Sequence, residues 1–275
     1  MSTSSSNPQV GVRKHFTSSI LLWMRTDQPR QQGMDHWKGP HSAIIAASPG
    51  LEEYRQIHLA ETNPGLWPAT NGVETQIPAD RKVDGVAEVT FQSVLSPLRG
   101  RTQTRLAFKD EVNVFRRTLL YAGVPNTSRW YEVADPAENV GARAVVYLRR
   151  RDGIRGREFR RVIKTELVPA LIAIGVLKEL RTQTFLPWNE KTWGTPHVAH
   201  DNPTDQRFHA SLILGFADAN ARTAFFEGTD IEQLSQTLAP VASAIHAYEV
   251  FAALTYVKDG GILCITRNDR EPTQW

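Results

Sequence analysis

Cysteine is almost absent from this chain: Cys264 is the only one among its 275 residues. A single thiol excludes a framework of internal disulfides and suits a protein that folds in a reducing compartment. We interpret Cys264 as a small structural side chain and not as a nucleophile. The chain also lacks an apolar run of the roughly 18 residues that a transmembrane helix needs, and its start lacks the apolar segment of a signal peptide. We therefore expect a soluble, cytoplasmic protein without a membrane partner.

Motifs for several well-known chemistries are missing as well. The sequence has no Gly-rich phosphate loop, no Gly-x-Ser-x-Gly elbow and no Cys-x-x-Cys-His segment, so that a nucleotide-binding or hydrolase function is not indicated. The net charge is only +3, although the pI is 9.1. Arginines cluster between Arg143 and Arg161, but no stacking aromatics or nucleic-acid-binding module accompany them. We interpret this cluster as a solvated face and expect no nucleic-acid partner.

The composition that remains is that of a globular protein, with 41% hydrophobic and 22% charged residues. Alternating and continuous apolar runs predict eight strands, at 16–25, 51–60, 85–94, 129–133, 142–150, 177–187, 207–216 and 246–256. Helices are expected at 33–47, 103–122, 157–174 and 219–243. In the second of these, Phe108, Val112, Phe115 and Leu119 recur at helical spacing, and Gly123 with Pro125 follow as stop signals.

Each half of the chain thus reads β-α-β-β-α-β, the order of a ferredoxin-like unit. Segments of the first half recur in the second: 51–55 at 177–181, 131–133 at 248–250 and 22–25 at 146–149, at offsets of 126, 117 and 124 residues. Such recurrence favours a tandem duplication. We expect an α+β fold in which two antiparallel sheets pack face to face as an internal dimeric α/β barrel. The expected organisation is a disordered tail at 1–14, units at 15–138 and 139–267, and a C-terminal tail at 268–275.

Two long polar connections, 62–82 and 188–205, lie at the same place in each unit. Loops of this length inside a compact domain are usually functional or disordered. Because the first carries Trp67 and the second Trp188 and Trp193, we expect them to act as lids over a pocket. The second also contains His197, His200 and Asp201, with His209 on the strand that follows. These side chains are of the types that bind zinc or iron, but their spacing matches no recognised metal motif, so that we favour a solvated loop and assign no metal.

Candidate catalytic residues occur early in the chain. Trp37 and His41 are four residues apart on a predicted helix and share a side, and Tyr54, Gln56 and His58 alternate on one face of the next strand. If both sides face inward, two imidazoles line one cavity and could take and return a proton, while Tyr54 or Gln56 hydrogen-bonds a developing enolate. The alternative is structural, with His41 packed on the sheet and His58 bonded to a backbone carbonyl. The second half offers Phe159, Leu180, Gln183 and Phe185 at corresponding places, which restricts the predicted chemistry to the first unit.

These residues also carry a family resemblance. The pattern of Trp37, Gly39-Pro40-His41, Pro49-Gly50 and Tyr54-x-Gln56-x-His58 resembles the EthD family of the dimeric α/β-barrel superfamily, best over 16–60. The resemblance implies a ferredoxin-like fold with a pocket between helices and sheet. The superfamily includes polyketide cyclases, lactone isomerases, cofactor-free monooxygenases and haem-binding oxidative enzymes. Family members place the histidine before Gly-Pro, whereas here it follows, so that His36 is a second candidate for the helix histidine.

The sequence therefore predicts a small-molecule enzyme of secondary metabolism or catabolism, of cyclase, isomerase or monooxygenase type, acting on an apolar oxygenated substrate without a cofactor. The predicted catalytic residues are His41, His58 and Tyr54. The predicted substrate-binding residues are Trp37, His36, Gln56, Trp67 and Trp23. A non-catalytic ligand-binding protein with the same pocket and a haem-associated oxidative protein are the alternatives. The barrel is expected to close within the chain, and further homodimerisation stays open.

Overall fold

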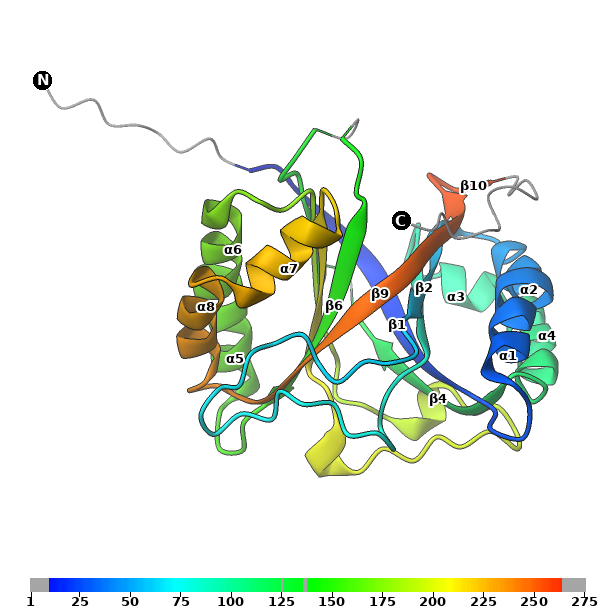
Figure 1. Ribbon diagram of the computed structural model, residues 1–275. Helices are drawn as coiled ribbons and strands as arrows, with labels where there is room; N and C mark the ends of the chain where they lie inside the picture. The colour runs from blue at the N-terminus through cyan, green and yellow to red at the C-terminus, as the bar shows by residue number, and fades with distance from the viewer. Residues whose placement is uncertain (1–9, 125, 136–137, 264–275) are drawn as a thin grey trace, which may run out of the picture.

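A barrel of strands lies between two layers of helices, as Figure 1 shows for the computed structural model. The structure describes residues 10–124, 126–135 and 138–263. The strands are β1 (Val12–Met24), β2 (Leu51–Leu59), β3 (Gly85–Phe91), β4 (Phe115–Ala122), β5 (Ser128–Tyr131), β6 (Ala142–Arg150), β7 (Glu179–Thr184), β8 (Ala210–Phe216), β9 (Ala242–Lys258) and β10 (Gly261–Ile262). The helices are α1 (Arg30–His36), η1 (Trp37–His41), α2 (Ser42–Ala46), α3 (Ser96–Arg99), α4 (Arg101–Glu111), α5 (Gly156–Val162), η2 (Ile163–Leu167), α6 (Val168–Ile174), η3 (Glu190–Thr192), η4 (Thr204–Gln206), α7 (Ala219–Glu227) and α8 (Asp230–Leu238).

The strands form one antiparallel sheet that closes on itself. Around the ring the order is β1, β3, β2, β9, β6, β8, β7 and β5, and β5 pairs again with β1. Strand β1 is long enough to pair with β5 through its first residues and with β4 through its last. The predicted α+β class and closed barrel are confirmed, but the strands join edge to edge in one continuous sheet and do not form two stacked sheets.

The two halves share an order of strand pairing. In the first half it is β4-β1-β3-β2, and in the second it is β9-β6-β8-β7. The halves meet where β9 pairs with β2 and where β5 pairs with β7. Helices α1 to α4 cover the outside of the first half and α5 to α8 the outside of the second (Figure 1). Strand β1 begins at Val12, inside the segment expected to be a tail. Cys264 and the tails 1–9 and 268–275 lie outside the described residues.

One predicted helix is wrong in its second half. The stretch 103–122 is helical only to Glu111, and Phe115–Ala122 is strand β4, paired with β1. Leu119 and Tyr121 belong to the apolar cluster inside the barrel, whereas Leu120 and Ala122 face the helix layer. A strand covered on both faces is apolar on both parities, so that its residues also match a helical spacing. Similarly, the helix expected over 219–243 ends at Leu238, and β9 begins at Ala242.

The first helix of each half contains a π-helical turn that the sequence analysis did not anticipate. In the first half η1 separates α1 from α2, and in the second η2 separates α5 from α6. Within η1, Pro40 has no N–H to donate to the preceding turn. Widening the turn is one way in which a helix accommodates such a residue. The wider turn directs Trp37 and His41 toward the sheet, where both are buried.

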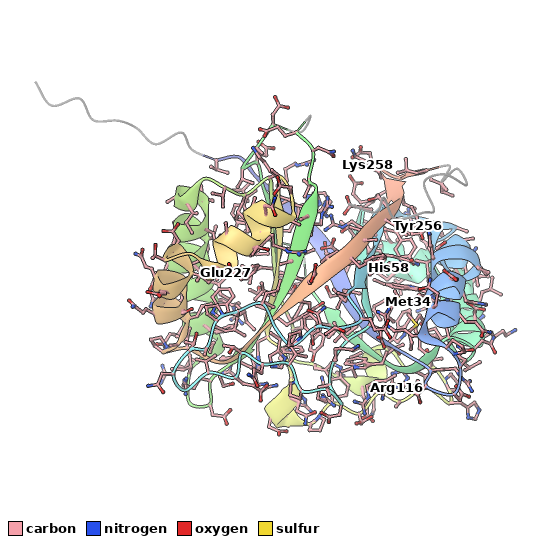
Figure 2. The ribbon with its side chains drawn as sticks, viewed as in Figure 1. Met34, His58, Arg116, Glu227, Tyr256 and Lys258 are labelled. Atoms are coloured by element: carbon pink, nitrogen blue, oxygen red, sulfur yellow. The ribbon has the colours of Figure 1, made fainter. Side chains whose placement is uncertain are left out.

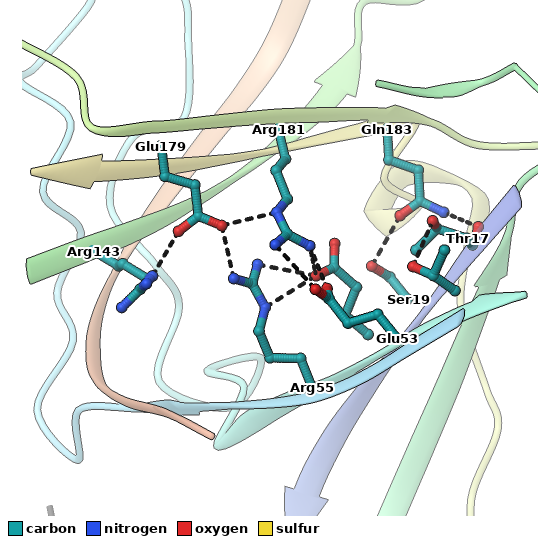
Figure 3. A network of polar contacts seen from close by, with 10 residues as sticks. Thr17, Ser19, Glu53, Arg55, Arg143, Glu179, Arg181 and Gln183 are labelled. Carbon is teal, nitrogen blue, oxygen red and sulfur yellow. Dashed lines mark hydrogen bonds and ion pairs between the residues drawn. The ribbon is translucent and has the colours of Figure 1, made fainter. Parts of the chain in front are cut away.

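A charged network inside the barrel joins the halves (Figure 3). Arg55 on β2 pairs with Glu179 on β7 at 2.7 Å, and Arg181 on β7 pairs with Glu53 on β2. Glu88 accepts from Arg55 and Arg181, and Arg143 lies 2.7 Å from Glu179. Each second strand thus contributes a Glu-x-Arg pair to the other, which is the reciprocal pattern of a two-fold interface. Because breaking a buried ion pair is costly, the network fixes how the halves meet.

The long loops cross between the halves. In the loop after β2, Leu66 N–H donates to Ala247 O at 2.8 Å, on the second half. In the loop after β7, Ala199 N–H donates to Arg116 O at 3.0 Å, on the first half. Figure 1 shows the two loops running beneath opposite helix layers. In the part of the chain that the structure describes, no helix is both long and apolar enough to cross a membrane.

Candidate functional site

A cavity of about 520 Å³ lies between the helices and the sheet of the first half. This volume falls within the range of small-molecule sites. The strands supply an apolar floor, made of Phe16, Ile20, Leu22, Leu51, Ala87, Val89, Phe91, Leu120 and Ala122. Polar groups enter from the helices and from the loop after β7. The cavity is therefore apolar with a few convergent polar side chains.

Helix α4 forms one wall through residues spaced three or four apart. These are Arg101, Thr104, Arg105, Phe108 and Glu111. This spacing places them in a stripe on one side of the helix, along which Arg101 and Arg105 are exposed and Glu111 is buried. The stripe changes character along its length, from two arginines in the first two turns, through an aromatic ring, to a carboxyl at the last turn.

The π-helical turn η1 supplies Trp37 and His41 to the opposite wall. The Nδ1 atom of His41 lies 2.9 Å from Oδ2 of Asp110, and His36 Nε2 lies 2.9 Å from Oδ1 of the same carboxylate. The hydrogen bond from His41, and then that from His36, lower the pKa of Asp110. With Nδ1 engaged by a carboxylate, the Nε2 atom of His41 is the nitrogen left for a ligand in the cavity.

Glu111 is the functional candidate that sequence reasoning missed. Its Oε2 atom accepts from the Thr195 hydroxyl and, at 3.3 Å, from the Trp193 indole N–H, both on the loop of the other half. Burial raises the pKa of this carboxyl to about 7. Buried carboxyls tuned toward neutrality are typical of acid–base sites. The one available signal was its position at the buried end of this stripe of α4, where an apolar residue would be expected.

The strand pattern Tyr54, Gln56 and His58 lies one layer away from the cavity, behind Trp37. Gln56 Nε2 donates to Trp37 O and to Tyr54 Oη, at 2.8 Å each, and His58 Nε2 donates to Gln56 Oε1 at 3.0 Å. The His58 ring stacks on Trp37 with centroids 4.5 Å apart. Figure 2 shows His58 on the side of the sheet that carries α1, near Tyr256. Gln56 thus satisfies the carbonyl of Trp37 in the π-helical turn, and Tyr256 Oη donates to the next carbonyl, Lys38 O, at 2.7 Å.

Burial changes the titration of this layer. It lowers the pKa of His58 to about 3, with smaller contributions from Lys38 and Arg30. It also raises the pKa of Tyr54 well above its usual range. Imidazole and phenol are therefore both neutral near pH 7, as suits groups that hold a backbone turn in place.

Gly85 on β3 makes room for the Trp37 ring. A Cβ at this position would lie 2.3 and 2.5 Å from two atoms of the indole. Real Cβ atoms do not approach so closely, so that any side chain at this position would displace Trp37 from the cavity wall.

The other predicted site residues lie elsewhere. Trp67 packs in the helix layer of the second half, where its Nε1–H donates to Ser235 Oγ at 2.8 Å. Trp23 lies inside the barrel, below Arg117. His200 contacts the carbonyl oxygens of Thr118 and Thr195 through its two ring nitrogens.

The remaining candidate ligands for a metal are also engaged. Asp201 pairs with Arg117, and His209 Nδ1 accepts from Arg150 N–H. Across residues 10–124, 126–135 and 138–263, no three His, Cys, Asp or Glu side chains are grouped so as to hold a metal ion.

The helix layer of the second half is filled. A buried apolar cluster occupies it, built from β6, β7, β8, β9 and helices α5 to α8. Trp67, Phe225 and Phe226 belong to it, and the ring of Trp67 meets Phe226 edge-on. The cavity and the filled core are thus counterparts on opposite sides of the barrel.

Comparison with known proteins bears on the fold. No protein-family model matches the chain, and no curated protein matches it significantly. A candidate monooxygenase from Lactobacillus acidophilus superposes with a TM-score of 0.52 at 9% identity, covering 92% of this chain and all of that one. An anthrone oxidase-like protein superposes with a TM-score of 0.54 at 7% identity, covering 89% of this chain and 96% of that one. A candidate monooxygenase from Fusobacterium nucleatum gives 0.53 at 7% identity, covering 89% and 98%.

The shared fold is a closed antiparallel β-barrel with helices on its outside. Identities of 7 to 9% support a statement about architecture only. The three superpositions cover nearly the whole length of each chain, so that both halves of the barrel take part in the likeness. The chemistry of the cavity has to be argued from its own residues.

Proposed function

We propose that this chain is a small-molecule enzyme that moves protons on an apolar oxygenated substrate bound in the cavity of the first half, without an organic cofactor. One observation carries the proposal: His41, held by Asp110, and Glu111, a buried carboxyl with a pKa of about 7, line the same cavity. Enolisation requires a general base and a general acid, and one apolar site here contains both. We also propose that the chain is EthD-like and cytoplasmic.

In this mechanism His41 is the base and Glu111 the acid. The Asp110 carboxylate holds the imidazole with its proton on Nδ1, so that Nε2 takes a proton from a carbon next to a carbonyl. Because Thr195 and Trp193 both donate to Oε2 of Glu111, the acid form carries its proton on Oε1 and gives it to the developing enolate oxygen. Tyr54, Gln56 and His58 position the turn that carries His41.

The same offset at several sites supports a tandem duplication as the origin of the two halves. The π-helical turns begin at Trp37 and Ile163, and the reciprocal ion pairs start at Glu53 and Glu179. The residues of each pair are 126 positions apart, as are Trp67 and Trp193. Under this proposal the barrel needs no second copy to close, and the partner is the small-molecule substrate.

Oxidation of anthrone tests the enzymatic proposal, since one structural neighbour is named anthrone oxidase-like. Anthrone and O₂ give anthraquinone and water once the ring methylene has lost a proton. We expect His41→Ala and Glu111→Gln each to lower kcat/KM by about 10² to 10⁴, and the rate to fall as pH rises through about 7, because Glu111 then loses the proton it must donate. Full turnover in both variants contradicts the proposal, and no wild-type acceleration favours a non-catalytic binding protein.

A second candidate is a haem-associated oxidative protein, favoured by the His41–Asp110 pair. Metal-binding histidines commonly donate their other ring nitrogen to a carboxylate, and His41 has this arrangement on the wall of an apolar cavity. The site thus fits haem through His41 Nε2, and bound haem would supply oxidative chemistry. Haem titration followed by Soret absorbance tests this: binding that His41→Ala abolishes supports it, and binding that is unchanged contradicts it.

A further inference from the structure

We propose that the ligand of this cavity is an amphipathic anion, with an extended apolar body and a carboxylate, sulfonate or similar group at its outer end. The statement deepens the proposed function, on which it rests, by naming the substrate class of the same site. It depends on where the arginines of α4 lie, on what they contact and on how the cavity changes along its length.

Arg101 and Arg105 lie at the outer edge of the cavity, where both are exposed to solvent. They are four residues apart on the same side of α4, and both line the cavity. In the second half the corresponding helix α8 presents Ile231, Leu234 and Leu238 to the sheet, all buried.

Neither guanidinium is paired with another side chain in the described part of the chain. Among the described residues, no ion pair or side-chain hydrogen bond involves Arg101 or Arg105, whereas Arg25, Arg117 and Arg161 each pair with a carboxylate. A free guanidinium offers a planar fork that matches carboxylate or sulfonate oxygens. Two such forks, one helical turn apart, form the cationic entrance of a cavity that is otherwise apolar.

The rest of the cavity requires an apolar body. Ile20, Leu22, Ala87, Val89 and Leu120 form the floor on strands β1, β3 and β4. A ligand that covers this floor removes apolar surface from water, which contributes about 25 cal/mol for each Å² buried. A small hydrophilic anion would leave this surface wet.

The charges also set the direction and length of the ligand. Glu111 is six residues from Arg105 and ten from Arg101, or about 9 and 15 Å along the helix axis. An anionic group at the inner end would meet the carboxyl of Glu111, whose ionised form would repel it, so that the reversed orientation is disfavoured. The group that reacts therefore lies about 9 to 15 Å from the anionic group.

A matched pair of fluorescent probes tests the proposal: anilinonaphthalene sulfonate and its uncharged analogue N-phenylnaphthylamine. Fluorescence titrations use the full chain, shown beforehand to have no Soret absorbance. In the double variant Arg101→Gln/Arg105→Gln we expect sulfonate affinity to fall about three- to tenfold, since each exposed pair contributes modestly, while the uncharged probe is unaffected. The matched control is Arg99→Gln, an exposed arginine on α3 outside the cavity lining, which should change neither affinity.

A cavity-filling variant places the probes in the site. Ala87 lies on the floor, and Ala87→Phe should abolish binding of both. Sulfonate binding that survives Ala87→Phe, equal weakening of both probes in the double variant, or an equal effect of Arg99→Gln would each overturn the proposal. Circular dichroism checks that every variant is folded.

Failure here is separable from failure of the proposed function. His41→Ala and Glu111→Gln should keep the dependence of sulfonate binding on Arg101 and Arg105. A protein that shows this dependence but does not turn over anthrone supports the ligand class and contradicts the acid–base role. A protein that turns over anthrone, but whose sulfonate binding does not depend on Arg101 and Arg105, supports the acid–base role and contradicts the ligand class.

Discussion

Each helix layer of this barrel receives one tryptophan from a long loop of the other half. The two tryptophans are equivalent in position but make different contacts. Trp67 of the first half enters the second layer, where it is buried and donates to the hydroxyl of Ser235. Trp193 of the second half reaches the first layer, where it borders the cavity and donates to the carboxyl of Glu111. One layer is thus a filled core and the other contains the candidate site. The acceptor of the indole N–H differs accordingly, a hydroxyl in the core and a carboxyl in the site.

Removing each tryptophan is the strongest test of this contrast. Trp67→Ala leaves a hole in a filled core and should cost about 3 to 5 kcal/mol of unfolding free energy. Trp193→Ala only widens an existing cavity, so that we expect about 1 kcal/mol or less, together with altered probe binding. Urea denaturation measures both. Equal costs would show that the first layer is packed as tightly as the second.

The reciprocal ion pairs test whether the halves remain equivalent inside the barrel. Arg55→Gln removes one of the cations that Glu88 and Glu179 share, and Arg181→Gln leaves Glu53 without its ion-pair partner. Each should cost about 3 to 5 kcal/mol. Denaturant unfolding of the two variants gives the comparison. If one variant loses much unfolding free energy and the other none, the two halves have diverged inside the barrel as well as in the helix layers.

Glu111 makes stability depend on pH, which Ser235 in the other layer cannot do. Burial raises the pKa of Glu111 from 4.5 to about 7, so that the folded state keeps a proton that the unfolded state gives up in this interval. The wild type should lose up to about 3 kcal/mol as pH rises from about 4.5 to about 7. Glu111→Gln should remove most of this slope in unfolding measured across pH, and Ser235→Ala should leave it intact. An unchanged slope in Glu111→Gln would contradict the raised pKa.

The smallest expected effect concerns the cavity wall. Gly85→Ala forces the Trp37 ring away from β3 and should cost about 1 to 3 kcal/mol, with weaker probe binding. The control is Gly39→Ala, where an added Cβ meets nothing within 4 Å. Thermal unfolding and probe titration of both variants separate a local clash from a general sensitivity of η1. Equal behaviour of the two would mean that Trp37 is not held by β3.

Local sequence patterns predicted most of the architecture but not the centre of the site. The order of elements and the placement of His41 and Trp37 followed from alternation, helical spacing and a family resemblance. Strand β4 was mistaken for helix because Leu119 and Leu120 face two different apolar layers. Glu111 was not singled out from the sequence, since its environment comes from Trp193 and Thr195, more than eighty positions away. Nothing local distinguishes Trp67, which fills a core, from Trp193, which borders a cavity.

The crossing of the loops has a consequence during synthesis. The sheet, the π-helical turn and α4 of the first half are complete once Ala122 has been made, but Trp193 and Thr195 follow about 70 residues later, or several seconds at typical elongation rates. In that interval the carboxyl of Glu111 has neither of its donors and the cavity has no cover on that side. Ribosome-bound chains stopped before and after Thr195 should therefore differ in the solvent access of Glu111. The site is enclosed only once the loop of the second half has been synthesised.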